Sequence, residues 1–282
     1  MGLMNDEIKL GVSYNVFDGE EHLENSILCI RENVDFICVV YQTISNYGQH
    51  REDLEPFLID LKQRGLIDYL YHYTPKKIEG KAKGEINEII KRNIGRDICV
   101  KVGNCTHHIT MDCDEMFIPE EFEKAKDYVI SNNYDTSYVE YDNYYKKPNL
   151  VISKKGFMKA TKQRSITLGY ISFIVKCDKR NYGGGVSPIF VDPTRTIDCG
   201  DFIILNSRDI KMHHYSYIRS GEESLRRKLN NTSFKQHEKA ESGYEKVVER
   251  FNNYKDGDLG IIPWVGGAIE VELSDVKDRL KL

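Results

Sequence analysis

Long apolar runs and paired cysteines are the features that this 282-residue chain lacks most clearly. No apolar stretch approaches the length of about 18 residues that a membrane-spanning helix needs, and the first seven residues have neither the basic nor the apolar region of a secretory signal. The seven cysteines are odd in number, scattered and without a Cys-x-x-Cys pair, which fits reduced, buried thiols. We therefore expect a cytoplasmic protein without a transmembrane segment, and peripheral association with a membrane stays open.

A dominant charge sign is also missing. Forty basic residues stand against 44 acidic ones, a net charge of −4, so there is no broad basic surface for nucleic acid and no nucleic-acid partner is expected. Basic clusters such as Arg226-Arg227-Lys228 are local. With 40% hydrophobic residues the chain can bury a full core. We expect a catalytic domain over residues 1–220 and a mainly helical C-terminal extension over residues 221–282.

In the first 115 residues, apolar runs typical of buried strands alternate with stretches that are apolar every three or four residues. This alternation predicts the α/β class, with a doubly wound, mostly parallel sheet. The carboxyl ends of such strands form one ligand-binding edge. The expected strands are Ile8 to Ser13, Asp35 to Tyr41, Ile67 to Tyr73 and the run that ends at Met111; the expected helices are Glu20 to Asn33, Arg51 to Arg64 and the segment from Ile86 to Ile98.

The rest of the chain repeats neither the alternation nor any internal motif. We expect a capped helix over Pro119 to Asn132 and an aromatic strand over Thr136 to Tyr145, followed by a mixture of short strands and helices. The further expected strands are Leu150 to Ser153, Tyr170 to Val175, Phe202 to Leu205 and Ala268 to Leu273; the further expected helices are Glu222 to Leu229 and Ser242 to Tyr254.

Asp112 and Asp114 follow the fourth expected strand and are the most informative pair in the sequence. Side chains at i and i+2 of an extended segment point the same way, so the two carboxylates could share one hard cation. Unpaired carboxylates at the end of a buried strand would be costly, and a metal ion carrying phosphates would compensate them. Asp-x-Asp also arises by chance, and Asp256-Gly257-Asp258 is such a copy in a solvated turn.

A second block, about a hundred residues further on, runs from Lys211 to Arg219 and contains His213-His214-Tyr215-Ser216-Tyr217. Together with the Asp-x-Asp-Glu sequence at Asp112 to Glu115, it resembles the GT-A fold glycosyltransferases, nearest to the family 2 type. The resemblance covers roughly residues 8 to 232 and includes Tyr14 to Glu20 and Lys91-Arg92-Asn93. The chain departs from that family at Tyr41-Gln42-Thr43, where many relatives carry a pair of acids for the nucleotide.

The resemblance implies a role for each matching residue. Asp112, Asp114 and His214 would hold Mn²⁺ or Mg²⁺, with His213 as the alternative to His214. The ion would neutralise charge that develops on the leaving diphosphate. The residues that would contact the donor are Tyr14, Asn15, Phe17, Asp18, Arg92, Asn93, Asp112, Arg219 and Lys228.

Each of these roles has a simpler alternative. Turn chemistry would account for Asn15, Phe17 and Asp18, and solvation for the basic pair on the helix. His107 and His108 lie within the strand, so we expect them to be buried and hydrogen-bonded. The tyrosines of residues 138–145 are expected to pack on the core.

Sugar transfer with inversion also needs a carboxylate that takes the proton of the acceptor hydroxyl. The candidates are Asp192, Glu140, Asp142 and Asp198, and we favour Asp192. It follows the apolar run Ile189-Phe190-Val191 and a glycine-rich loop, Gly183-Gly184-Gly185, that could act as a lid.

The sequence therefore predicts a metal-dependent glycosyltransferase, which would move a sugar from a nucleotide-sugar, expected to be a UDP-sugar, to a hydroxyl of a glycan or cell-surface polysaccharide precursor. One rival is a sugar-phosphate nucleotidyltransferase. That class usually has a glycine-rich, basic loop after the first strand, whereas Tyr14 to Gly19 has one glycine and no basic residue. The other rival is a non-catalytic nucleotide or carbohydrate binder of the same fold.

Overall fold

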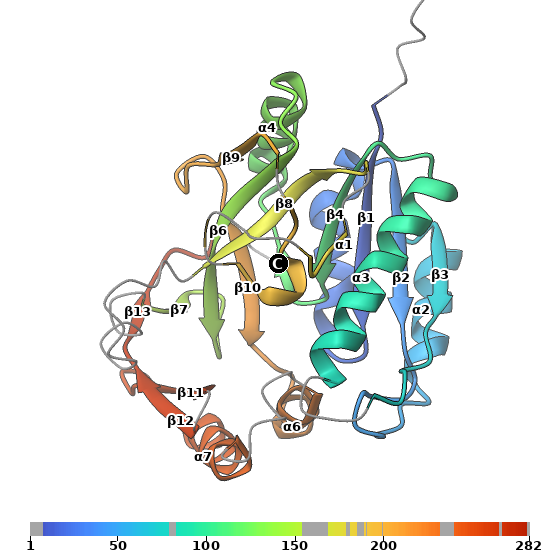
Figure 1. The fold of residues 1–282 in the computed structure, drawn as a ribbon. Helices are drawn as coiled ribbons and strands as arrows, with labels where there is room; N and C mark the ends of the chain where they lie inside the picture. Colours follow the sequence, from blue (N-terminus) through green and yellow to red (C-terminus); the bar gives the residue numbers. More distant parts are fainter. Residues whose placement is uncertain are drawn as a thin grey trace, which may run out of the picture.

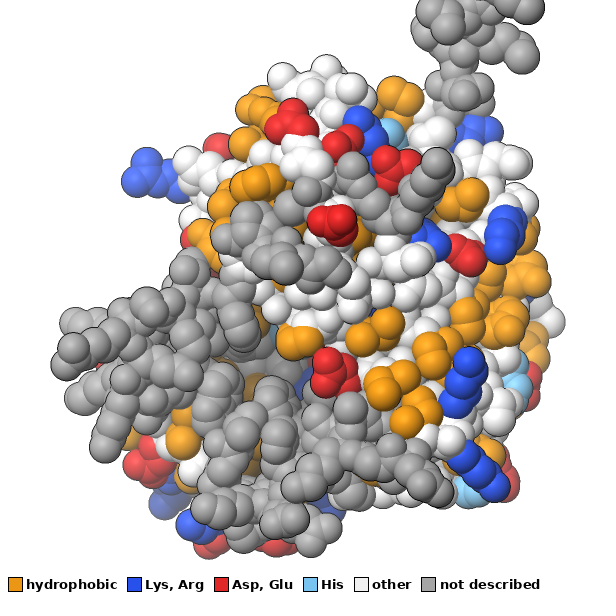
Figure 2. All heavy atoms as spheres, in the orientation of Figure 1, with side chains coloured by type: hydrophobic (Ala, Val, Ile, Leu, Met, Phe, Trp, Pro, Cys, Tyr) orange, Lys and Arg blue, Asp and Glu red, His pale blue; other side chains and the backbone are white. Residues whose placement is uncertain are grey.

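The structure is a computed structural model of the chain. It describes residues 8–78, 83–153, 169–178, 181–184, 189, 191–198, 200–231, 240–264 and 267–280. In this part of the chain no helix is both long enough and apolar enough to cross a bilayer. On the face shown in Figure 2, described acidic and basic side chains are interspersed.

Four parallel strands form the core of the main sheet, in the order β3-β2-β1-β4. In Figure 1, α3 lies on one face of these strands and α1 and α2 lie on the other. The strands are β1 (Leu10–Val16), β2 (Phe36–Tyr41), β3 (Tyr69–His72) and β4 (His107–Asp112); the helices between them are α1 (Glu20–Ile30), η1 (Arg31–Asn33), α2 (Leu54–Gln63) and α3 (Lys83–Lys101).

The near-continuous apolar sequence of β2 follows from burial on both faces. Ile37 and Val39 belong to the large core on the side of α1 and α2, whereas Cys38 and Val40 pack in a separate cluster with residues of α3. Gly95 lets α3 approach β1 closely, because a Cβ atom there would lie 2.5 Å from the side chain of Ser13. The helix is thereby held against the strands that carry the candidate site.

Beyond β4 the sheet is mixed. β8 is antiparallel to both β4 and β6, whereas β10 is parallel to β6 and antiparallel to β5. The predicted α/β class is confirmed, but beyond the four core strands parallel and antiparallel pairs are mixed. The remaining elements of this region are β5 (Glu115–Met116), α4 (Pro119–Ser131), β6 (Thr136–Tyr145), β7 (Leu150–Ile152), β8 (Tyr170–Lys176), η2 (Pro193–Arg195), β9 (Phe202–Ile204) and β10 (Met212–Tyr217).

The C-terminal segment contains the two expected helices, but strands make up much of the rest. β11 and β12 form an antiparallel hairpin, of which only the region of β12 was expected from the sequence. β13 pairs with β7 and so adds the C-terminal segment to the main sheet. The elements are α6 (Glu222–Asn231), α7 (Ala240–Asn252), β11 (Gly260–Trp264), β12 (Gly267–Val271) and β13 (Leu273–Asp275).

Candidate functional site

A cavity of about 250 Å³ lies at the carboxyl ends of β1, β2 and β4. This is the edge at which α/β sheets bind ligands, and the loops that follow β1, β2 and β4 all contribute to it. Many of the residues singled out in the sequence line it. They are Asn15, Phe17, Asp18, Asp112, Asp114, Asp192, His214 and Lys228.

Strand pairing brings these distant residues together. Asn15 is the partner of Asp112 in the parallel ladder between β1 and β4. The strand β10 then returns along β5, where His214 pairs with Glu115. The histidine is thereby placed beside the acidic turn, although about a hundred residues separate the two in the sequence.

Asp112 is held by two buried arginines. Nη2 of Arg92 lies 3.1 Å from its Oδ1, and Nη2 of Arg195 lies 2.7 Å from its Oδ2. Burial by itself would raise the pKa of Asp112, but the charges of Arg92 and Arg195 outweigh it and hold the pKa well below its usual range. The carboxylate is therefore charged, and two arginines compensate its charge. The sequence had predicted a metal ion in that role.

Arg195 is the residue that the sequence reasoning missed. Its guanidinium donates to both carboxylate oxygens of Glu115, at 2.5 and 2.9 Å, as well as to Asp112. Glu115 also accepts a hydrogen bond from the backbone N–H of Asp112. Glu115, the last acid of the Asp-x-Asp-Glu sequence, thus stabilises the turn and does not line the cavity. The only signal for this was an arginine in the turn that begins at Asp192.

Asp114 is compensated by the second sequence block. Arg219 donates to its Oδ2, and Nζ of Lys228 lies 3.1 Å from the same oxygen. The other oxygen, Oδ1, lies 3.4 Å from Nε2 of His214. Burial would raise the pKa of Asp114, but Lys228, His214 and Arg219 lower it well below its usual range. Asp114 is therefore an anion with one oxygen engaged by cations and one directed toward the histidine.

Asp114 and His214 fit two positions around a single divalent ion. Ligand atoms that bind one ion at right angles at roughly 2.1 Å lie about 3 Å apart, close to the observed separation of 3.4 Å. In the described part of the chain, no group of three or more His, Cys, Asp and Glu side chains is placed to hold a metal ion. Cations that bind nucleotides commonly take one or two protein ligands and fill the other positions with phosphate oxygens and water.

Several predicted donor contacts lie outside the lining of the cavity. The hydroxyl of Tyr14 is in the core, 3.0 Å from Oγ of Ser26. Asn93 binds the backbone of Ile89 and Tyr182. Arg219 is buried behind Asp114. These side chains therefore support the site from behind.

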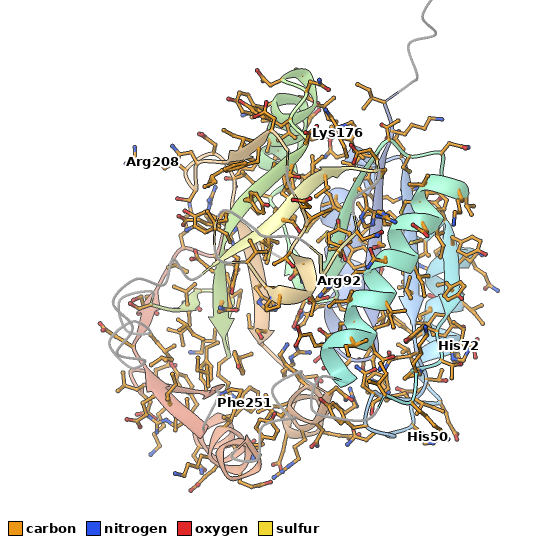
Figure 3. The ribbon with its side chains drawn as sticks, in the orientation of Figure 1. His50, His72, Arg92, Lys176, Arg208 and Phe251 are labelled. Atoms are coloured by element: carbon orange, nitrogen blue, oxygen red, sulfur yellow. The ribbon has the colours of Figure 1, made fainter. Side chains whose placement is uncertain are left out.

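Arg92 occupies a similar supporting position. It lies at the centre of the molecule, on α3 (Figure 3), and donates to Thr110 and Thr194 as well as to Asp112. Its side chain is 2% exposed. Arg92 therefore orients Asp112 and joins β4 to η2, and a direct contact with a ribose or phosphate has no support from its surroundings.

Unpaired polar atoms lie at the part of the cavity next to the carboxyl ends of β1 and β2. Both side-chain atoms of the Asn15 amide are buried without a hydrogen bond, and so are Oδ2 of Asp18 and Oε1 of Gln42. All three side chains line the cavity. Because buried polar atoms are nearly always paired in native proteins, these atoms point to a polar ligand.

Asp192 lies at the cavity and caps the N-terminus of η2. Its Oδ1 accepts from both the backbone N–H and the hydroxyl of Thr194, at 2.8 and 2.9 Å. Two of the alternative bases are engaged elsewhere, Asp142 with Lys211 and Glu140 with Tyr170. The lid suggested at Gly183-Gly184-Gly185 and the run Ile189-Phe190-Val191 fall partly outside the described residues.

Two further charged residues line the cavity and were not assigned from the sequence. Glu88 and Lys91 lie on the same side of α3, at i and i+3. Burial raises the pKa of Glu88 to about 7. Burial likewise lowers the pKa of Lys91. The sequence assigned no role to either residue, because a charge on a helix is ordinarily solvated.

His107, His108 and His213 have structural contacts, as expected for the first two. Nδ1 of His107 lies 3.0 Å from Oγ1 of Thr106. His108 is buried between the hydroxyls of Tyr182 and Ser13, each 2.9 Å away. His213 is buried as well, 2.6 Å from the hydroxyl of Tyr144, and so does not face the cavity. Tyr138, Tyr144 and Tyr145 are core residues, as predicted.

Comparison with known proteins returned solved structures only. No protein-family model and no curated protein matches the chain. TarS 1-349 of S. aureus is 10% identical over 87% of this chain and 71% of that chain, with a TM-score of 0.45. The same TarS fragment in complex with UDP-GlcNAc is 10% identical over 87% of this chain and 72% of that chain, with a TM-score of 0.43. GalNAc-T7 with UDP, GalNAc and Mn²⁺ is 11% identical over 90% of this chain and 53% of that chain, with a TM-score of 0.45.

These TM-scores are all below 0.5, so the class of the protein follows from its own architecture. The chain is an α/β protein with a mixed sheet, a parallel core and a charged cavity at the carboxyl edge of that core.

Proposed function

We propose that the chain is a GT-A type glycosyltransferase that uses a nucleotide-sugar, with UDP as the nucleotide. The observation that carries this proposal is the convergence of Asp114, His214 and Lys228 on one cavity, from the acidic turn after β4, from β10 and from α6. A charged cavity of this kind suits a substrate that brings both phosphates and a divalent cation.

The residues divide the cavity into two ends. Asn15, Asp18 and Gln42 offer unpaired polar atoms for a nucleoside at one end. Asp114 and His214 would hold Mn²⁺ or Mg²⁺ at the other end, where the cation would supply positive charge beside the leaving diphosphate. Lys228 lines the cavity and could exchange Asp114 for a phosphate oxygen, whereas Arg219 would hold Asp114 from behind.

Asp192 is the proposed base. Its carboxylate lines the same cavity, and it would take the proton from the acceptor hydroxyl as that oxygen bonds to the anomeric carbon and the nucleoside diphosphate leaves. Attack from the side opposite the leaving group would invert the configuration at that carbon. The acceptor would be a hydroxyl of a glycan or cell-surface precursor, and the reaction would take place in the cytoplasm.

The experiment has a binding step and a turnover step. Thermal unfolding of the protein is measured with UDP, with Mn²⁺, and with both together, since a ligand of the folded state raises the unfolding temperature. Release of UDP is then measured with a panel of UDP-sugars. We expect a rise in the unfolding temperature that requires both UDP and Mn²⁺. We also expect one of the UDP-sugars to release UDP slowly. A shift without release from any donor, with or without glycan acceptors, would favour a non-catalytic binder; consumption of UTP with a sugar phosphate would favour a nucleotidyltransferase.

A further inference from the structure

Lys91 is a buried lysine that lines the cavity. The residue is 5% exposed, yet in the described part of the chain no acceptor is hydrogen-bonded to its ammonium and no carboxylate forms an ion pair with it. The other lysine of the cavity, Lys228, lies 3.1 Å from Asp114. A buried charge that is left unpaired is costly, so the position of Lys91 is best explained by an anion that the cavity receives.

The surroundings of Lys91 indicate where that anion would lie. The acids whose charges act on it are Glu88, Asp112 and Asp18. Asp18 belongs to the loop after β1, at the proposed nucleoside end, and Asp112 ends β4, beside the proposed ion site. Lys91 therefore lies between the two ends, where the phosphates of a bound nucleotide would connect them.

We propose that Lys91 binds a phosphate oxygen of the donor nucleotide. This inference rests on the proposed function. Lys228 must give up Asp114 before it can contact a phosphate, whereas Lys91 gains an anion without breaking an existing ion pair. Lys91 can therefore bind a phosphate of the donor before the ion pairs at Asp114 rearrange.

The test compares the wild type with Lys91→Met, which keeps the length of the side chain and removes its charge. Lys101→Met is the matched control, because Lys101 lies on the same helix with a side chain that is 74% exposed. Binding of UDP, uridine and inorganic pyrophosphate is measured by calorimetry. A charge-assisted hydrogen bond contributes enough to change affinity about tenfold or more. We expect Lys91→Met to weaken the binding of UDP and of pyrophosphate by that factor and to leave the affinity for uridine unchanged. Lys101→Met should bind all three ligands like the wild type.

Thermal unfolding supplies a second measurement. Removing an unpaired buried charge should leave the ligand-free protein at least as stable as the wild type, so weak binding by Lys91→Met would not come from unfolding. A clear loss of stability would mean that the ammonium already has a partner and would contradict the proposal.

The other outcomes separate the two proposals. Equal affinity of Lys91→Met and the wild type for UDP overturns the role of Lys91 and leaves the glycosyltransferase assignment intact. If Lys91→Met binds UDP like the wild type but binds UDP-glucuronate more weakly, the anion that Lys91 contacts is a sugar carboxylate. That result would overturn the phosphate contact. If Lys91→Met loses affinity for UDP and pyrophosphate but no donor is ever cleaved, the role of Lys91 stands and the proposed function fails.

Discussion

Arg195 and Asp112 lie 83 positions apart in the sequence, and Nη2 of the arginine is 2.7 Å from Oδ2 of the aspartate. The same guanidinium binds Glu115. One buried arginine thus fixes both ends of the acidic turn, and it does so from η2, the short helix that Asp192 caps. The turn after β4 and the proposed base are therefore parts of one rigid arrangement, which makes the site sensitive to changes at residues that line no cavity.

Removing the charge of Asp114 should abolish the metal dependence of nucleotide binding. Asp114→Asn keeps the size of the side chain but gives up an anionic ligand, so we expect the combined shift with UDP and Mn²⁺ to fall to the level seen with UDP alone. Thermal unfolding with each ligand measures this. Asp114→Ala is unsuitable, because it would leave Arg219 and Lys228 without any acceptor, whereas the amide oxygen of Asn can still accept from them. A metal-dependent shift that survives in Asp114→Asn would exclude this carboxylate as a ligand.

Asp192→Asn should separate chemistry from binding. The amide oxygen can still accept from Thr194, but it cannot take a proton, so we expect turnover to fall by about 10²–10⁴-fold with little change in UDP affinity. UDP release and calorimetry give the two quantities. Asp209→Asn, at an exposed position outside the cavity, is the control. Full activity in Asp192→Asn would move the base to another residue.

Arg195→Met should unfold readily. The substitution leaves Glu115 buried without its cation and removes one of the two arginines on Asp112. We expect a loss of about 3–5 kcal/mol in the free energy of unfolding, measured with denaturant. Arg208→Met, at an exposed position, should change it by less than about 0.5 kcal/mol. Similar values for the two variants would mean that Arg195 does not hold the turn.

Gly95→Ala tests the close packing of α3 on β1. The new Cβ atom would lie 2.5 Å from the side chain of Ser13, so helix and strand must separate, at a cost of about 1–3 kcal/mol. Gly221→Ala is the control, because a Cβ atom there meets nothing within 4 Å. Denaturant unfolding of both variants measures the difference. If Gly95→Ala were as stable as Gly221→Ala, the helix would not be held so tightly.

His108 should make the protein sensitive to acid. Burial lowers its pKa to about 3, below the value of about 6.5 in an unfolded chain. Between these values the unfolded chain binds a proton that the folded protein does not, so the free energy of unfolding falls as the pH decreases through this window. In His108→Gln this contribution disappears, and its unfolding free energy should decline less steeply from about pH 6.5 to pH 4. His50→Gln, at an exposed position (Figure 3), should follow the wild type.

The sequence by itself determined the parallel core and the place of the site. Apolar runs of strand length alternate with amphipathic helices up to residue 115, and the period of each pattern fixes which side chains are buried. The loops that follow β1, β2 and β4 had to meet at one edge, because parallel strands share the direction of their carboxyl ends. The structure confirms that edge and the buried state of His107 and His108.

Only the tertiary structure decided how the charges at that edge are compensated. Asp112 and Asp114 could be found from their spacing, but Arg195 and Lys91 could not, since an arginine in a turn and a lysine on a helix are ordinarily solvated. Long-range packing buries both of them beside the acids. The mixed part of the sheet and the pairing of β13 with β7 were equally out of reach, because strand partners far apart in the sequence are chosen by packing and not by local pattern.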